Sequence, residues 1–107
     1  MVKITVLYPN IEARRFDVDY YLNVHMPMSI EKLGASMKGV TVEIGISGAT
    51  DGTPPPFVAL CHFIFESADA FLKAFMPHAE LLMGDMVNYT DIESVIQISE
   101  VRIHQLN

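Results

Sequence analysis

FVALCHFIF, residues Phe57 to Phe65, is apolar at every position except His62. A run of this length and composition is typical of a central strand in a sheet, and we expect it to be buried on both faces. The preceding stretch, Val40 to Ser47, alternates apolar with small or polar residues, which predicts a second strand. The loop between them contains an Asp51-Gly52 turn signal, so the two strands are expected to pair antiparallel.

Two more strands lie toward the ends of the chain. Val2 to Tyr8 alternates and stops at a Pro-Asn turn, and Val95 to Ile103 is the last apolar stretch. A helical pattern separates each of them from the central pair. The first helix is expected to begin at Asp17 and the second after Ser67, because both side chains can cap the free amides of a first helical turn.

Each predicted helix carries one apolar stripe and one proline. The stripe of the first helix comprises Tyr21, Val24, His25 and Met28. The stripe of the second helix comprises Phe71, Phe75, His78 and Leu82. Because Pro27 removes a backbone donor, the first helix is expected to kink near His25-Met26. Pro77 interrupts the second helix in the same way.

The element order β-α-β-β-α-β, with right-handed crossovers, predicts an α+β fold of the ferredoxin-like type. This is a four-stranded antiparallel sheet with both helices on one face. At 107 residues the chain has room for a single domain, residues 1–107. The other sheet face would expose bulky apolar side chains to water, so we expect a homodimer in which sheet packs on sheet, the dimeric α+β barrel. Whether such dimers assemble further stays open.

The charge of the chain argues against several partners. Its net charge is −6, and no Lys/Arg cluster is longer than Arg14-Arg15, so neither nucleic acid nor a membrane surface is an expected partner. No apolar run reaches the roughly 18–20 residues of a membrane span. The single cysteine, Cys61, cannot form an intramolecular disulfide. A cytoplasmic protein without a signal peptide is expected.

His25 and His78 are the first candidates for catalysis, because an imidazole can move protons near neutral pH. Each lies on the buried stripe of its helix and both helices cover one sheet face, so the two are expected to border one cleft. Tyr21 shares the stripe of His25 and is the candidate phenol for stabilising an oxyanion. The alternative for both histidines is a core imidazole that is hydrogen-bonded to a carbonyl freed by a proline.

The other candidates are substrate-binding residues. Asp85 could orient an imidazole in a His–Asp pair, and Asn88 could donate to a carbonyl or an enolate, although both residue types are also common in turns. His62 shares strand parity with apolar neighbours and faces either the cleft or the dimer interface. The remaining candidates supply apolar walls for a small hydrophobic ligand or are ordinary core residues: Tyr20, Met28, Phe75 and Tyr89.

No metal and no cofactor is predicted. The histidines lack the close spacing of metal ligands, and the sequence signatures of nucleotide-binding loops and serine nucleophiles are absent. Haem held by an axial histidine is a third possibility, which a Soret shift on adding haem would reveal.

Several motifs follow one another along the chain. They are Lys3 to Pro9, Phe16-Asp17 with Tyr20-Tyr21 and His25-Met26-Pro27, Pro55-Pro56-Phe57 with His62, Phe65-Glu66-Ser67, and Gly84-Asp85 with Asn88 to Asp91. From Lys3 to about Val101 the chain thereby resembles the EthD family. The resemblance implies the dimeric α+β-barrel superfamily, in agreement with the fold predicted from the residue pattern.

The family name comes from a protein required for bacterial degradation of ethyl tert-butyl ether, where it accompanies a haem-containing monooxygenase. The wider superfamily includes cofactor-free monooxygenases, isomerases, cyclases and ligand-binding domains, so the resemblance implies several chemistries.

Two functions are therefore expected. The first is a cofactor-free enzyme of catabolism or secondary metabolism that carries out acid–base or oxidative chemistry on a small hydrophobic carbonyl or phenolic compound. It would be an isomerase, cyclase or lyase, or an oxidoreductase of the monooxygenase type. The alternative is a non-catalytic carrier or accessory protein that holds a hydrophobic intermediate for a partner oxygenase.

Overall fold

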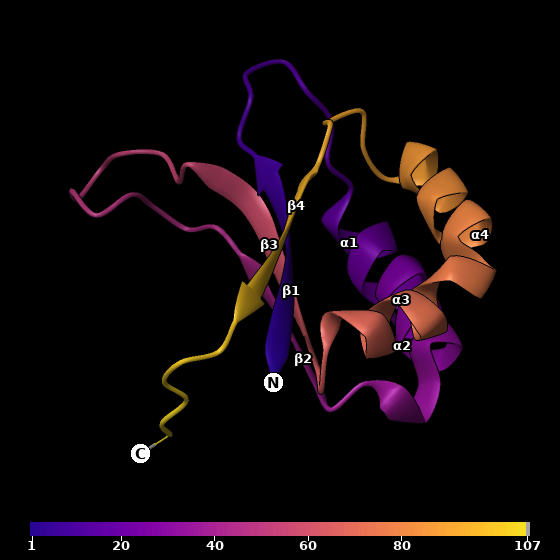
Figure 1. Cartoon of the computed structure of the whole chain (residues 1–107). Coiled ribbons are helices and arrows are strands. Elements are labelled where there is room, and N and C mark those ends of the chain that lie inside the picture. The colour runs from indigo at the N-terminus through magenta and orange to yellow at the C-terminus, as the bar shows by residue number, and fades with distance from the viewer. Residues whose placement is uncertain (107) are drawn as a thin grey trace.

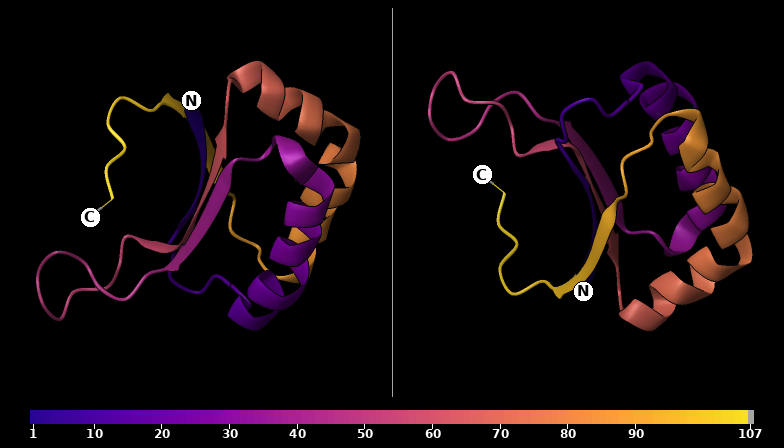
Figure 2. Two further views of the ribbon diagram at one scale, coloured as in Figure 1. Left: turned by 90° about the horizontal axis from the view of Figure 1, so that it is seen from below. Right: turned by 90° about the horizontal axis from the view of Figure 1, so that it is seen from above.

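The computed structural model describes residues 1–106, which form a four-stranded antiparallel sheet with a helical layer on one face (Figures 1 and 2). The strand order is β2-β3-β1-β4. The strands are β1 (Val2–Pro9), β2 (Gly39–Ile44), β3 (Phe57–Phe65) and β4 (Val95–Glu100). Both the predicted α+β class and the ferredoxin-like element order are confirmed.

β3 has the predicted bounds, whereas β2 and β4 end earlier than predicted. The amide of Gly45 still donates to the carbonyl of Val58 at 3.0 Å, but the ladder cannot extend much further, because the next residues of the facing chain, Pro54 to Pro56, have no N–H to give to it. The apolar residues beyond the two strand ends, Ile46 and Ile103, are 93% and 86% exposed. The alternation of apolar residues alone therefore overestimated the length of both strands.

The expectation that β3 is buried on both faces is wrong for the single chain. Its odd-numbered residues from Ala59 to Phe65 are buried beneath the helices, whereas its even-numbered residues are only half-buried on the other face. Within residues 1–106 both helical regions lie on the same side of the sheet, which leaves an open face on the other side (Figure 2). His62 lies on this open face, where Nε2 is 2.9 Å from Oε1 of Glu43 and Nδ1 is 3.0 Å from Oγ1 of Thr5.

The first helical region is continuous but irregular. It comprises α1 (Val18–Tyr20), the π-helical turn η1 (Tyr21–His25), α2 (Met26–Leu33) and the 3₁₀ turn η2 (Gly34–Ser36). The predicted start is confirmed, since Oδ1 of Asp17 accepts a hydrogen bond of 3.1 Å from the amide of Tyr20. The disturbance expected ahead of Pro27 takes the form of η1, in which the amide of Met26 donates to the carbonyl of Tyr21, five residues back.

The wider turn changes which residues face the sheet. The buried residues of this region are Tyr21, His25, Met26, Ser29 and Leu33. The predicted stripe is therefore wrong at Val24, which is 44% exposed, and at Met28, which is only half-buried. A π turn adds one residue to the helical repeat. The residues that face the sheet after the turn are therefore displaced by one position from those of a regular α-helix.

The second helical region is broken at Pro77, as predicted. It comprises α3 (Ala68–Phe75), the 3₁₀ turn η3 (Met76–His78), α4 (Ala79–Gly84) and the 3₁₀ turn η4 (Asp85–Asn88). Oγ of Ser67 accepts from the amide of Ala70 at 3.0 Å and caps α3 as expected. Among residues 1–106, none of the helices has the combination of length and apolar character needed to cross a bilayer.

Candidate active site

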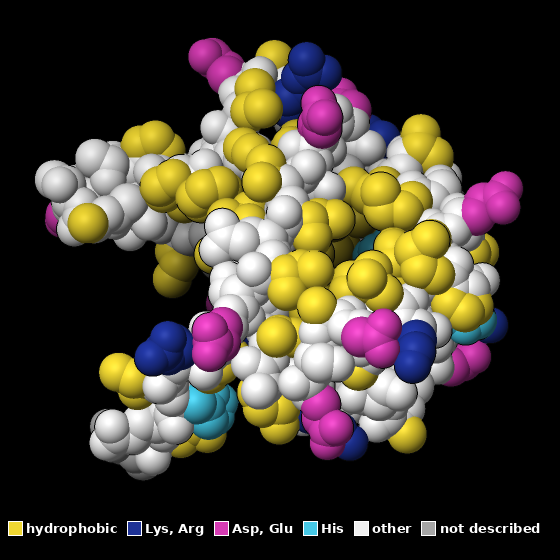
Figure 3. All heavy atoms as spheres, viewed as in Figure 1, with side chains coloured by type: hydrophobic (Ala, Val, Ile, Leu, Met, Phe, Trp, Pro, Cys, Tyr) yellow, Lys and Arg dark blue, Asp and Glu magenta, His cyan; other side chains and the backbone are white. Residues whose placement is uncertain are grey.

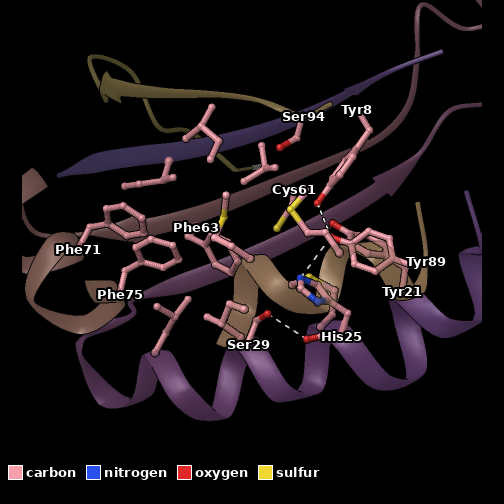
Figure 4. Close-up of a pocket in the computed structure, with 18 residues that line it drawn as sticks. Tyr8, Tyr21, His25, Ser29, Cys61, Phe63, Phe71, Phe75, Tyr89 and Ser94 are labelled. Atoms are coloured by element: carbon pink, nitrogen blue, oxygen red, sulfur yellow. Dashed lines mark hydrogen bonds between the residues drawn. The ribbon is translucent and has the colours of Figure 1, made fainter. Parts of the chain in front are cut away.

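A cavity of about 70 Å³ lies between the sheet and the helical layer (Figure 4). Its walls are mostly aliphatic and aromatic side chains from β1, β3, the first helical region and the second. Nearly all of these side chains are buried or half-buried, but Met83 of α4 and Ile96 of β4 are 49% and 48% exposed. The cavity therefore opens between α4 and β4, where Figure 3 shows a hollow rimmed by hydrophobic side chains.

His25 is the one histidine in the lining of this cavity. It is the last residue of the π turn, is only 7% exposed, and places Nδ1 2.9 Å from Oδ2 of Asp85 in η4. The two residues are 60 positions apart in the sequence and come from the two different helical regions. The structure thus forms the His–Asp pair that the sequence raised as a possibility for Asp85.

The carboxylate of Asp85 is itself held by neighbouring donors. Oδ1 accepts from the hydroxyl of Tyr20 at 2.7 Å and from the side-chain amide of Asn88 at 3.0 Å. Burial by itself would raise the pKa of Asp85, but the hydrogen bonds from Asn88, Tyr20 and His25 outweigh it and lower that pKa below its ordinary value. Asp85 is therefore ionised at neutral pH.

Burial determines the protonation state of His25, and the ionised carboxylate determines which ring nitrogen carries the proton. Burial lowers the pKa of His25 below its ordinary value of 6.5, and the partly compensating attraction of Asp85 does not restore it. The ring is therefore neutral at pH 7. Because Asp85 can only accept, the ring proton is assigned to Nδ1, which leaves Nε2 with a free lone pair.

Two phenol hydroxyls extend this network (Figure 4). The hydroxyl of Tyr89 lies 3.4 Å from Nε2 of His25 and 2.7 Å from the hydroxyl of Tyr8. Since Nε2 accepts, the hydroxyl of Tyr89 donates a hydrogen bond to it and accepts one from the hydroxyl of Tyr8. The contact to His25 is long, so Nε2 is only weakly engaged. Burial raises the pKa of Tyr8 to about 12 and raises that of Tyr89 as well, so both phenols stay protonated.

A third phenol in the lining, Tyr21, has a hydroxyl without a hydrogen-bond partner among the described residues. The side chain is 1% exposed, and the hydroxyl lies near Cys61 and Tyr8. Burial raises the pKa of Tyr21 above its ordinary value. Leaving a buried hydroxyl unpaired costs about 1–3 kcal/mol, so this position is unfavourable unless something else accepts its proton.

Removing the Tyr21 hydroxyl should therefore not weaken the fold. We expect Tyr21→Phe to leave the free energy of unfolding unchanged or to raise it. The matched variant Tyr89→Phe should lower it by about 1–2 kcal/mol, because it removes the partner of the Tyr8 hydroxyl and of Nε2 of His25. Urea denaturation measures both values. A loss of more than about 1 kcal/mol in Tyr21→Phe would contradict the assignment of an unpaired hydroxyl.

The other predicted site residues fall into three groups. Phe75 and Tyr89 line the cavity, while Tyr20 and Asn88 lie behind it and bind Asp85. The expectation that His25 and His78 border one cleft is wrong, because His78 lies outside the lining, half-buried in η3. His78 and Met28 lie outside the lining of the cavity, and His62 lies on the open sheet face, which was one of its two expected positions.

Tyr8 and Cys61 belong to the cavity but were not among the predicted site residues. Both follow the strand alternation that places Ile4 and Phe63 under the helices, and this alternation is the signal that would have found them. Burial raises the pKa of the Cys61 thiol to about 12, so it contributes an apolar wall and no nucleophile. Across residues 1–106, no three side chains of the His, Cys, Asp or Glu type converge as a metal ion would require.

These features define the class of protein: a ferredoxin-like α+β protein with a His–Asp pair at the polar end of an apolar cavity. The family model described as "EthD domain" matches residues 10–93, so the chain belongs to the EthD family.

Three solved structures are similar to this chain. An EthD-like protein from Ralstonia eutropha JMP134 is 46% identical with a TM-score of 0.92, over 97% of this chain and 94% of that one. A protein of the ethyl tert-butyl ether (EthD) family from Bacillus halodurans C-125 is 20% identical with a TM-score of 0.73, over 94% and 98%. HapK from Hahella chejuensis is 13% identical with a TM-score of 0.53, over 98% of both chains. The last two share the fold. No curated protein matches the chain.

Proposed function

We propose that this protein is a cofactor-free enzyme that removes a proton from a small hydrophobic carbonyl or phenolic compound, with His25 as the base. The observation that carries this proposal is the His25–Asp85 pair at the polar end of an otherwise apolar cavity. A neutral imidazole whose Nε2 is engaged only by the long contact from Tyr89 can accept a proton, and an ionised carboxylate behind it stabilises the cation that forms. The apolar walls favour a hydrophobic substrate.

In the proposed step, a C–H bond beside a carbonyl or the O–H bond of a phenol breaks, and its proton goes to Nε2 of His25. The bonding electron pair moves onto the substrate oxygen, which becomes an enolate or phenolate. Tyr21 stabilises that charge by donating its hydroxyl proton in a hydrogen bond. The imidazolium then returns the proton at another position, which yields isomerisation, cyclisation or a related acid–base reaction.

An oxidative form of the same reaction uses dioxygen as co-substrate. The substrate carbanion gives its electron pair to dioxygen, a C–O bond forms, and the resulting peroxide takes the proton of the imidazolium to give a hydroperoxide. Substrate-dependent oxygen consumption distinguishes this oxidoreductase form from simple proton transfer.

Proton abstraction can be followed as exchange of α-hydrogen for deuterium in D₂O by NMR, in a panel of methyl ketones of increasing chain length. We expect the protein to accelerate exchange, and more strongly for longer chains. Absence of acceleration over the whole panel would contradict the proposal.

The alternative is a carrier or accessory protein for a partner oxygenase. It is supported by the apolar lining, which would retain a hydrophobic intermediate without any use of His25. Breakdown of an ether is one setting for such a role, since the family of the Bacillus halodurans relative is named for ethyl tert-butyl ether. Binding of the ketones without any exchange would favour this alternative.

We also propose that the protein is a cytoplasmic homodimer joined through the open sheet face. This face carries half-buried apolar side chains, among them Leu7, Leu60 and Ile64. The loop from 45 to 56 and the C-terminal segment from 101 to 106 project on the same side and bracket the face (Figure 2). Burial of this apolar surface against a second copy would remove it from water.

A charge in the middle of the open face should prevent this association. We expect Leu60→Glu to convert a dimer into a monomer, because a carboxylate would be buried without a partner. Sedimentation velocity reports the mass of each species. The matched variant Ile30→Glu, on the outer surface of α2, should remain dimeric. Wild-type protein that is monomeric at micromolar concentration would contradict the proposed dimer.

A further inference from the structure

We infer that the substrate is an elongated molecule with an oxygen acceptor at one end of a hydrophobic chain, and that it enters oxygen first and stops at the hydroxyl of Tyr21. The chain then leaves the cavity between α4 and β4. This inference rests on the proposed function and narrows its substrate class.

One fully buried hydroxyl in the lining of the cavity is a hydrogen-bond donor without a partner among residues 1–106. Tyr8 and Tyr89 are committed to each other and to His25 at 2.7 and 3.4 Å. Tyr21 is as deeply buried but has no partner within the described chain. A hydroxyl in this position is complementary to a ligand oxygen that accepts a hydrogen bond. The nearby Nε2 of His25, which is held only weakly, is complementary to an adjacent acidic hydrogen.

The size of the cavity limits what fits there. A water-sized group needs a cavity volume of about 10–15 Å³, so a cavity of about 70 Å³ holds roughly five such groups. This is room for a methyl ketone or the oxygen-bearing edge of a phenol, and it is too little for a long hydrophobic compound. The remainder of such a compound must lie in the opening.

The opening is built to take a hydrophobic chain. Met83 and Ile96, which flank it, are about half exposed, and Ile98 lies on the same side of β4 and is 44% exposed. The rim seen in Figure 3 is accordingly hydrophobic. Three partly exposed apolar side chains in line with a buried cavity favour an alkyl or aryl extension of the ligand over a polar one.

The experiment measures binding by calorimetry with methyl hexyl ketone and with the isosteric alkene in which a methylene group replaces the carbonyl oxygen. We expect the ketone to bind wild-type protein about tenfold more tightly than the alkene. Tyr21→Phe should abolish this ratio by weakening ketone binding alone. Para-hexylphenol and hexylbenzene form a second pair, and the pair with the larger Tyr21-dependent ratio identifies the oxygen as a carbonyl or a phenol.

The chain is tested with methyl ketones from acetone to methyl hexyl ketone. Each added methylene should tighten binding by about fourfold in wild-type protein. Ile96→Ser should flatten this dependence, whereas Val95→Ser, on the other face of β4, should preserve it.

An oxygen-dependent ratio that survives in Tyr21→Phe, or equal binding of ketone and alkene in both oxygen pairs, would overturn the inference. So would a chain-length dependence that Ile96→Ser leaves intact. Binding is measured without any reaction. If the expected binding pattern is found but the protein does not accelerate α-hydrogen exchange, the proposed catalysis is refuted and the inferred substrate class stands.

Discussion

Replacing His25 by Ala is expected to reduce protein-catalysed exchange of ketone α-hydrogens to the rate in buffer, a loss of about 10²–10⁴-fold. The variant removes the one imidazole that lines the cavity and leaves Oδ2 of Asp85 without its hydrogen-bond partner. NMR in D₂O measures the exchange rate at saturating ketone, so that a change in affinity does not enter. Ketone binding should persist, because the apolar walls and Tyr21 are unchanged.

The second histidine of the helical layer supplies the control. His78 lies in η3 outside the cavity, so His78→Ala should keep the exchange rate within about twofold. Added imidazole should restore part of the rate to His25→Ala by entering the vacated space. Equal losses in both variants, or full activity of His25→Ala, would show that the base lies elsewhere.

Replacing Asp85 by Asn is expected to cost about 10²-fold in the exchange rate, the next largest effect. The imidazolium loses the carboxylate that stabilises it. The new amide can also donate to Nδ1, which would move the ring proton to Nε2 and block the site of proton uptake. Asn88→Ala removes only one donor to Asp85 and should cost a few-fold at most.

The pH dependence of the rate tests the same pair. The active form has a neutral His25, so the rate should rise as pH increases through the pKa of His25, which lies below 6.5, and then level off. Asp85 raises that pKa, so in Asp85→Asn the rise should occur at lower pH. A rise that moves to higher pH in the variant would contradict the assigned role of Asp85.

Local pattern was sufficient to predict the elements and their order. The bounds of β3, the caps at Asp17 and Ser67, and the break at Pro77 follow from residues within a few positions of each other. The extra length predicted for β2 and β4 shows the limit of this information. Alternation records which residues are apolar, but a strand also needs a partner with free hydrogen-bonding groups.

The site was less predictable because it depends on how a helix relaxes around proline. Pro27 indicates that a backbone N–H donor is missing from the helix. It does not indicate that the helix responds by forming a π turn over Tyr21–His25. That turn moves Met26 and Ser29 into the cavity lining, which the predicted stripe did not include. Asp85, the partner of His25, lies 60 residues away in the sequence. The sequence could therefore suggest that Asp85 pairs with an imidazole, but it could not determine which histidine provides it.

The ring of His25 allows the most direct test of the account, since its protonation state can be read without a substrate. Nitrogen NMR of labelled protein distinguishes the two ring nitrogens and follows their titration. We expect a neutral ring at pH 7 that carries its proton on Nδ1, with a titration midpoint below 6.5. A cationic ring at that pH, or a neutral ring protonated on Nε2, would contradict it.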